Sequence, residues 1–174
     1  RINMGLTVDN APKTLISMGA YVIIMPDKKY INTEDLSDYG DIEASVTTTS
    51  TVTFTLCKND GTAIEGAAVQ ATAPVNPQNM ALWIDTSSVP HSLKQYSATT
   101  SMWISIASTY IRISATGIGV PFSDSDGVSI SGITSPELAD LNSTQVLWSR
   151  GDDYIVVTGI LDKVTTQDAP ITIT

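Results

Sequence analysis

Few side chains in this sequence combine the types and spacing that catalysis requires. His91 is the only histidine, and it follows Pro90 in a segment that also contains Asp85 and Ser88. A serine hydrolase needs a serine activated by a histidine that a carboxylate orients, and its nucleophile often stands between glycines on a tight turn. No serine here has such glycine neighbours. We therefore interpret His91 as a loop residue and expect no catalytic residues and no enzymatic activity.

Carboxylates are the other groups that could do chemistry. The segment 123–127 reads SDSDG, and its Asp124 and Asp126 are candidate calcium ligands because calcium prefers several oxygen ligands on a flexible loop. The segment lacks the spacing and the distal glutamate of an EF-hand, so a solvated turn is the favoured alternative. A glycosidase needs two carboxylates about 5 to 9.5 Å apart across a cleft. With 18 acidic residues some close pair is inevitable, so the number alone does not indicate a glycosidase.

Aromatic side chains and the single cysteine complete the candidates. Trp148 and Tyr110 are candidates for stacking against a ligand such as a sugar, whereas the alternating strands around Trp83 and Trp103 favour a place in the core. Cys57 is the only cysteine, which excludes an intramolecular disulfide and a cysteine zinc site. It ends an alternating apolar run, so we interpret it as a buried small hydrophobe. We expect no cofactor.

Charge excludes several classes of partner. The 174 residues include 9 basic and 18 acidic side chains, and the formal net charge is −9. Binding to nucleic acid or to an anionic membrane surface needs clustered Lys and Arg, and only Lys28 and Lys29 are adjacent here. No apolar run approaches the roughly 18 residues of a membrane span. We therefore expect neither a nucleic-acid partner nor a membrane partner.

The elements that would position these side chains read as strands. Short β-branched and aromatic runs recur along the chain, separated by Gly, Pro, Asn and Asp, which predicts an all-β fold of small sandwich or barrel modules joined by turns. The run 19–25 is almost continuously apolar. It predicts a strand that is covered on both faces, or one whose face binds another part of a longer protein. Ser135, Pro136 and Glu137 predict one short helix near 135–142, with Ser135 as a possible cap.

The order of the runs suggests four parts. We expect the chain to be part of a longer parent protein, since it begins with arginine rather than methionine. The resemblance of residues 13–45 given below implies that residues 1–45 hold strands of that protein's body. Residues 46–107 would form a β-sandwich or meander module, and residues 108–168 a small β-barrel module. Residues 169–174 would return as a strand toward the parent body.

One stretch resembles a known module. Residues 82–86 (LWIDT), 93–96 (LKQY) and 102–106 (MWISI) resemble an LW-D-T, LK-Y, W module of phage tail-fibre and receptor-binding proteins. Alternating side chains suggest a three-stranded meander there. Its apolar face would consist of Leu82, Ile84, Leu93, Tyr96 and Trp103.

Two further stretches resemble phage proteins. Residues 126–132, 141–144 and 151–157 resemble a small β-barrel module of phage structural proteins, which is named for its likeness to the first-catalytic-cysteine half-domain of ubiquitin-activating enzymes. The sequence departs from that pattern at Ser143, where glycine is usual. The resemblance implies a fold and not ubiquitin chemistry. Residues 13–45 resemble part of a longer prophage protein of the tail or DNA-stabilisation type.

These resemblances imply a structural or interaction module of a bacteriophage or prophage tail, located in the virion. Its partners would be other tail proteins or copies of itself. One alternative is a receptor- or carbohydrate-binding module on the virion exterior, with a cell-surface glycan as its partner. A second alternative is a hydrolase that cleaves polysaccharide, which would need two carboxylates of opposed pKa in a cleft.

Overall fold

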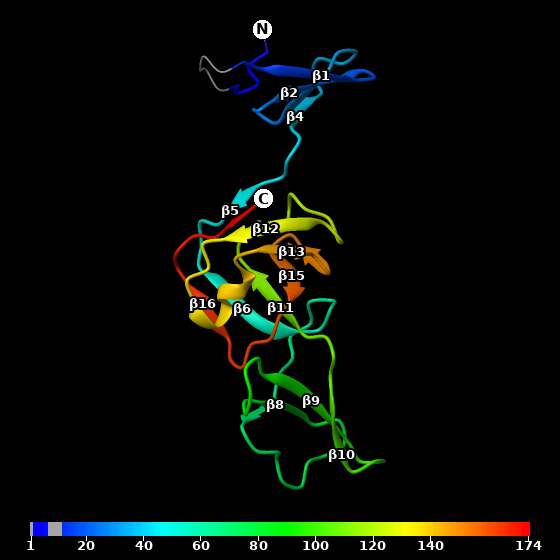
Figure 1. Ribbon diagram of the computed structural model, residues 1–174, viewed down its shortest axis with the longest axis vertical. Helices are drawn as coiled ribbons and strands as arrows, with labels where there is room; N and C mark the ends of the chain where they lie inside the picture. The colour runs from blue at the N-terminus through cyan, green and yellow to red at the C-terminus, as the bar shows by residue number, and fades with distance from the viewer. Residues whose placement is uncertain (1, 7–11) are drawn as a thin grey trace. The chain divides into compact units, whose positions relative to one another are not determined.

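The computed structural model describes residues 2–6 and 12–174 (Figure 1). Strands make up nearly all of its regular structure, and the one helix is the 3-10 helix η1 (Pro136–Leu141). The all-β class and the short helix near 135–142 are therefore confirmed. In the described part of the chain, no helix is long and apolar enough to cross a membrane. The chain divides into two compact units, Arg1–Ala44 and Ser45–Thr174.

Unit 1 is a four-stranded antiparallel sheet in the order β1-β2-β3-β4. Its strands are β1 (Thr14–Met18), β2 (Tyr21–Met25), β3 (Lys29–Asn32) and β4 (Tyr39–Asp41). The predicted apolar strand within residues 19–25 is β2, which pairs with β1 on one side and β3 on the other. Gly19 takes a φ of +63° between β1 and β2, a conformation that glycine adopts without steric cost.

Unit 1 has almost no core of its own. Ile24, 8% exposed, is the only buried apolar side chain in the described part of this unit. Every residue of β1 is exposed, including Leu15, Ile16 and Met18. A sheet with one covered face normally buries alternate side chains. The described residues of unit 1 therefore form a sheet without a second layer of their own.

Unit 2 is built on two antiparallel sheets. The first has the order β14-β15-β11-β6-β16 and the second the order β13-β12-β17-β5. The strands of the first are β6 (Val52–Cys57), β11 (Tyr110–Ser114), β14 (Ser149–Gly151), β15 (Tyr154–Thr158) and β16 (Thr165–Gln167). Those of the second are β5 (Val46–Thr47), β12 (Gly127–Ser131), β13 (Thr144–Val146) and β17 (Thr172–Ile173).

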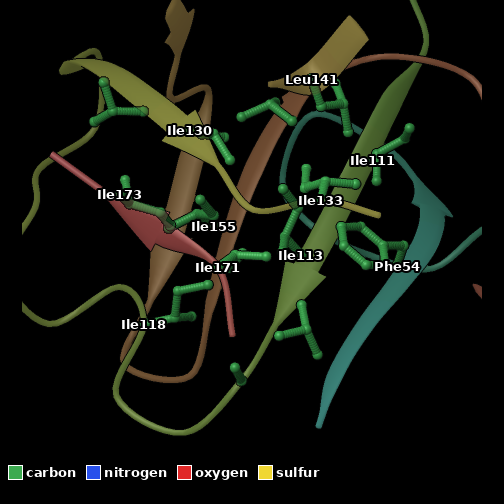
Figure 2. Close-up of a cluster of buried hydrophobic side chains, with 14 of the residues drawn as sticks. Phe54, Ile111, Ile113, Ile118, Ile130, Ile133, Leu141, Ile155, Ile171 and Ile173 are labelled. Carbon is green, nitrogen blue, oxygen red and sulfur yellow. The ribbon is translucent and has the colours of Figure 1, made fainter. Parts of the chain in front are cut away.

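One apolar core lies between these two sheets. Phe54 and Ile113 from the first sheet are fully buried, and Ile130 and Ile173 from the second belong to the same cluster. Figure 2 shows these side chains converging from both sheets. Period-two alternation explains the arrangement, because β12 reads exposed and buried in turn along its length. The result is a β-sandwich.

A third sheet is inserted between two neighbouring strands of the sandwich. Its order is β10-β9-β8-β7, and its strands are β7 (Ala68–Gln70), β8 (Leu82–Asp85), β9 (Ser92–Ser97) and β10 (Met102–Ser105). The chain leaves the sandwich after β6 and returns in β11, which pairs with β6 along its whole length. A smaller core of Leu56, Ile84 and Leu93 joins the inserted sheet to the end of β6.

The pairing differs from the predicted modules. Strand β6 was expected in the module 46–107 and β11 in the module 108–168, yet both lie in one sheet. The barrel expected for 108–168 is not formed: among the described strands, the two edge strands β14 and β16 do not pair with each other, so the sheet stays open. In the segment 169–174, β17 pairs with β12 and β5, and it completes the second sheet of unit 2.

Candidate functional site

The two aromatic residues singled out for ligand stacking lie together. Tyr110 and Thr158 are direct partners on β11 and β15, and Trp148 precedes β14. The rings of Tyr110 and Trp148 lie 5.4 Å apart between centroids at an angle of 68°. The indole N–H of Trp148 donates a hydrogen bond to Thr158 Oγ1 at 2.9 Å, and Trp148 is 51% exposed. Because the rings pack edge to face, they do not form one coplanar surface for stacking.

Thr158, the hydrogen-bond partner of Trp148, belongs to the wall of a cavity of about 570 Å³, whereas neither aromatic ring lines it. Its size falls within the range of small-molecule sites. Its apolar lining includes Ile111, Leu138, Leu141 and Leu161, all of which are buried. Its polar lining consists of His91, Glu137, Asp140, Gln145, Thr158 and Asp162.

Helix η1 supplies both apolar and polar lining residues, because one of its faces is buried and the other is exposed. Leu138 and Leu141 point into the core, and Glu137 and Asp140 are exposed. The predicted side-chain cap at Ser135 is not formed. Instead, Asn142 closes the segment: its Oδ1 accepts from the Ile133 N–H at 2.9 Å and its Nδ2 donates to the Ile133 carbonyl at 2.8 Å. Asn142 therefore fixes where the helix and its two carboxylates stand.

His91 comes to the cavity from the loop between β8 and β9. This position could not be predicted from the sequence, because the other lining residues, apart from Val89, Pro90 and Ile111, lie more than forty positions further along the chain. The nearby Asp85 does not orient the histidine. Its carboxylate instead accepts hydrogen bonds from the Lys94 ammonium at 2.7 Å and from the Ser87 backbone N–H at 2.9 Å.

The acidic loop considered for calcium, residues 123–127, forms a turn that a hydrogen bond to its own Asp126 stabilises. Asp126 Oδ2 accepts the Ser123 N–H at 2.7 Å, while Asp124 is exposed. Among residues 2–6 and 12–174, no three His, Cys, Asp or Glu side chains are grouped so that they could hold a metal ion. The geometry therefore does not bring Asp124 and Asp126 together with further ligands.

The inserted sheet presents a second aromatic cluster. Trp103 lies 5.3 Å from Trp83 and 5.4 Å from Tyr96 between ring centroids, and the Lys94 ammonium sits 4.7 Å from the Trp83 ring. Trp83 is 5% exposed, as its predicted core role requires. Hydrogen bonds from Lys94, which has the larger effect, and from Ser87 lower the pKa of the Asp85 carboxyl to about 2.

The predicted apolar face of this meander is wrong in part. Leu82, Ile84 and Leu93 lie on the face that packs against the sandwich. Tyr96 pairs with Trp103 across the strands, and both lie on the opposite face with Trp83. The reason is strand alternation: Leu93 and Tyr96 are three positions apart and must face opposite ways.

Cys57 is a structural residue in this fold. It is 1% exposed at the end of β6, as predicted for a small buried hydrophobe. Burial raises the pKa of its thiol to about 11. Because the thiolate is the reactive form, this thiol is inert at neutral pH.

Comparison with family models, with curated proteins and with solved structures gave no match to this chain. Its function therefore has to be inferred from its own side chains and surfaces.

Proposed function

We propose that the chain is a structural interaction module of a bacteriophage or prophage tail particle, without catalysis of its own. The observation that carries this proposal is the uncovered sheet of unit 1. On β1, Leu15 is 65% exposed, Ile16 45% and Met18 61%. Contiguous exposed apolar side chains mark protein–protein contact sites, because leaving them in water forfeits the free energy of burial.

The edge of the same sheet supports the proposal. Among the described strands β1 pairs only with β2, so one row of its backbone N–H and C=O groups has no strand partner. Edge strands in isolated proteins are commonly protected by charged residues or proline. Strand β1 reads Thr-Leu-Ile-Ser-Met and has neither. Such an edge suits addition of a strand from a neighbouring protein or from another copy of this chain.

The particle itself is proposed from the resemblances. Residues 82–106 resemble a tail-fibre module, and residues 126–157 resemble a module of phage structural proteins. The inserted sheet and the sandwich contain these two stretches. Tail particles are assembled from repeated protein contacts, which an uncovered sheet would serve.

The test replaces the exposed apolar face of β1. Ile16 and Met18 lie on one face of the strand, and we expect I16K/M18K to prevent incorporation of the protein into particles assembled in a host that lacks its own copy. The matched control is V75K/V120K, which changes two loop valines that are 87% and 59% exposed. Circular dichroism verifies that both variants fold. Equal incorporation of both variants would refute the proposal.

A second candidate function is carbohydrate binding on the particle exterior. The observation that favours it is the half-exposed indole of Trp148, which packs against Tyr110 and donates to Thr158, a residue of the cavity wall. A sugar ring can stack its apolar face on such an indole. A glycan array should give hits that W148A abolishes and W103A retains, and an array without hits would count against this candidate.

A further inference from the structure

We propose that the open edge of β1 pairs with β1 of a second copy of this chain, antiparallel and centred on Ile16, so that the four-stranded sheets of two copies become one. This inference rests on the interaction surface proposed above and names its partner. It starts from the backbone of β1, because the direction of the free N–H and C=O groups decides which pairings can form.

A hydrogen bond beside β2 shows how the backbone of that strand is directed. The Thr33 N–H donates to the Ala20 carbonyl at 2.7 Å, so Ala20 directs its carbonyl toward β3. Successive residues of a strand direct their backbone groups to opposite sides. Tyr21 and every second residue after it, including Ile23, therefore direct their backbone groups toward β1.

The register between β1 and β2 transfers this alternation to β1. Ile23 is the partner of Ile16, so Ile16 directs its N–H and C=O at β2. Its neighbours Leu15 and Ser17 direct theirs to the open edge. Among the described residues β1 pairs only with β2, and no turn or loop bonds to these groups. Two donors and two acceptors are therefore presented along the edge.

A second copy of β1 matches all of these groups when it runs antiparallel with Ile16 opposite Ile16. Leu15 of each copy then faces Ser17 of the other, and the two pairs form four backbone hydrogen bonds. Centring the pair on either Leu15 or Ser17 would form only two such bonds within β1, because the second pair would reach beyond the strand. The edge of β1 is therefore complementary to itself in one register.

The side chains agree with this register. Ile16 would face its own counterpart at a position without hydrogen bonds, where opposed Cα atoms lie about 4.5 Å apart and side chains are closest. Thr14 would face Met18 at each end of the pair, on the same face as Ile16. Because β1 contains no charged residue, no like charges would be opposed between the strands. The pairing would cover Ile16 and Met18, which are 45% and 61% exposed.

Charge selects the antiparallel orientation. The hydrogen bond between Thr33 and Ala20 places the loop 33–38 at the end of the sheet where β1 turns into β2. That loop contains three acidic residues and no basic residue. At the other end each lysine has an acidic partner, the pairs being Lys13–Asp27, Lys28–Glu43 and Lys29–Asp41. Antiparallel pairing sets each acidic end beside a compensated end, whereas parallel pairing would set the two acidic ends together.

The test is analytical ultracentrifugation of the intact chain with charges placed at position 16. We expect the parent chain to form a dimer whose fraction rises with concentration. Ile16→Lys and Ile16→Glu should each weaken dimerisation at least about tenfold, because like charges would face each other. An equimolar mixture of the two variants should restore the dimer, since opposite charges then face each other.

Val75→Lys and Val75→Glu are the matched controls. They make the same charge changes at a loop residue that is 87% exposed in unit 2, and both should dimerise like the parent chain. Circular dichroism verifies that every variant folds.

A disulfide gives a second readout of the register. Opposed Cα atoms at a position without hydrogen bonds lie within the distance that a disulfide spans. Ile16→Cys should therefore link two copies under mild oxidation, whereas Met18→Cys, which would face Thr14 of the other copy, should remain mainly unlinked. The native Cys57 is 1% exposed and does not compete.

Either of two results would overturn the proposal. One is a parent chain that stays monomeric up to about millimolar concentration. The other is a mixture of the Ile16 variants that remains monomeric, together with equal linking at positions 16 and 18.

These outcomes are separable from the assembly role. A monomeric chain that still loses particle incorporation with I16K/M18K would overturn this proposal and leave the assembly role standing, with a different protein on β1. A dimer with the expected charge pattern, combined with normal incorporation of I16K/M18K, would support this proposal and refute the assembly role.

Discussion

The side-chain amide of Gln167 forms hydrogen bonds with backbone groups of three other residues in the sandwich. Its replacement therefore tests what holds this part of the fold together. The side chain is 9% exposed at the end of β16. Its Nε2 donates to the carbonyls of Gly132 and Ala169 at 3.0 and 2.8 Å, and its Oε1 accepts the Thr134 N–H at 3.0 Å. These bonds tie β16 to the segment that leads into helix η1.

Gln167→Met keeps the length of the side chain and removes all three of these bonds. Each hydrogen bond contributes about 1 kcal/mol net, and buried backbone groups left without partners cost at least as much. We therefore expect the free energy of unfolding to fall by about 3 kcal/mol. For a domain of this size each kcal/mol corresponds to about 3 to 5 °C, so the melting temperature should drop by about 10 °C.

Thermal unfolding followed by circular dichroism measures this loss. Gln78→Met is the matched control, since Gln78 is exposed on a loop, and it should shift the melting temperature by less than about 2 °C. If Gln167→Met melts within about 2 °C of the parent chain, these three bonds do not hold the sandwich together. The role assigned to these bonds, which is to join β16 to the segment before η1, would then be refuted.

Three further predictions concern the described fold. Burial raises the pKa of Cys57 to about 11, so its thiol should resist alkylation in the native protein at pH 8 and react once the protein is unfolded. Because the folded state holds the thiol proton more tightly than the unfolded state, the free energy of unfolding should fall as the pH rises above about 9. The pKa of Asp85 is lowered to about 2, chiefly by the hydrogen bond from Lys94. The carboxylate therefore stabilises the fold above about pH 4, and this stabilisation is lost as the pH falls toward 2. D85N should remove that part of the acid transition when unfolding is measured as a function of pH. Gly119→Ala should abolish soluble expression because the added Cβ would lie 2.0 Å from a backbone oxygen, whereas Gly127→Ala meets nothing within 4 Å and should express normally.

The local features of the fold could be predicted from the sequence. Alternation identified strands such as β6, and Pro136 after Ser135 marked the short helix. The face of Tyr96 could also have been predicted, because three positions from Leu93 is an odd step in a strand. Trp148 and Tyr110 were singled out individually, but their contact depends on sheet pairing.

The long-range features could not be predicted in the same way. Strand β6 pairs with β11 across an inserted sheet, so the partner of Phe54 is Ile113 and the sequence between them gives no sign of it. The cavity has the same origin. His91, Asp140 and Asp162 are widely separated along the chain, and only the return of the chain to the sandwich brings them into one wall. No local pattern encodes such a juxtaposition.

Mass spectrometry of phage particles purified from an induced host that encodes the chain tests the proposed assembly role most directly. The peptide Gln95–Arg112 lies between two cleavage sites for trypsin and identifies the chain. We expect this peptide in purified particles at an abundance comparable to that of the tail proteins. Its absence from particles, together with its clear presence in the lysate, would contradict a structural role in the virion.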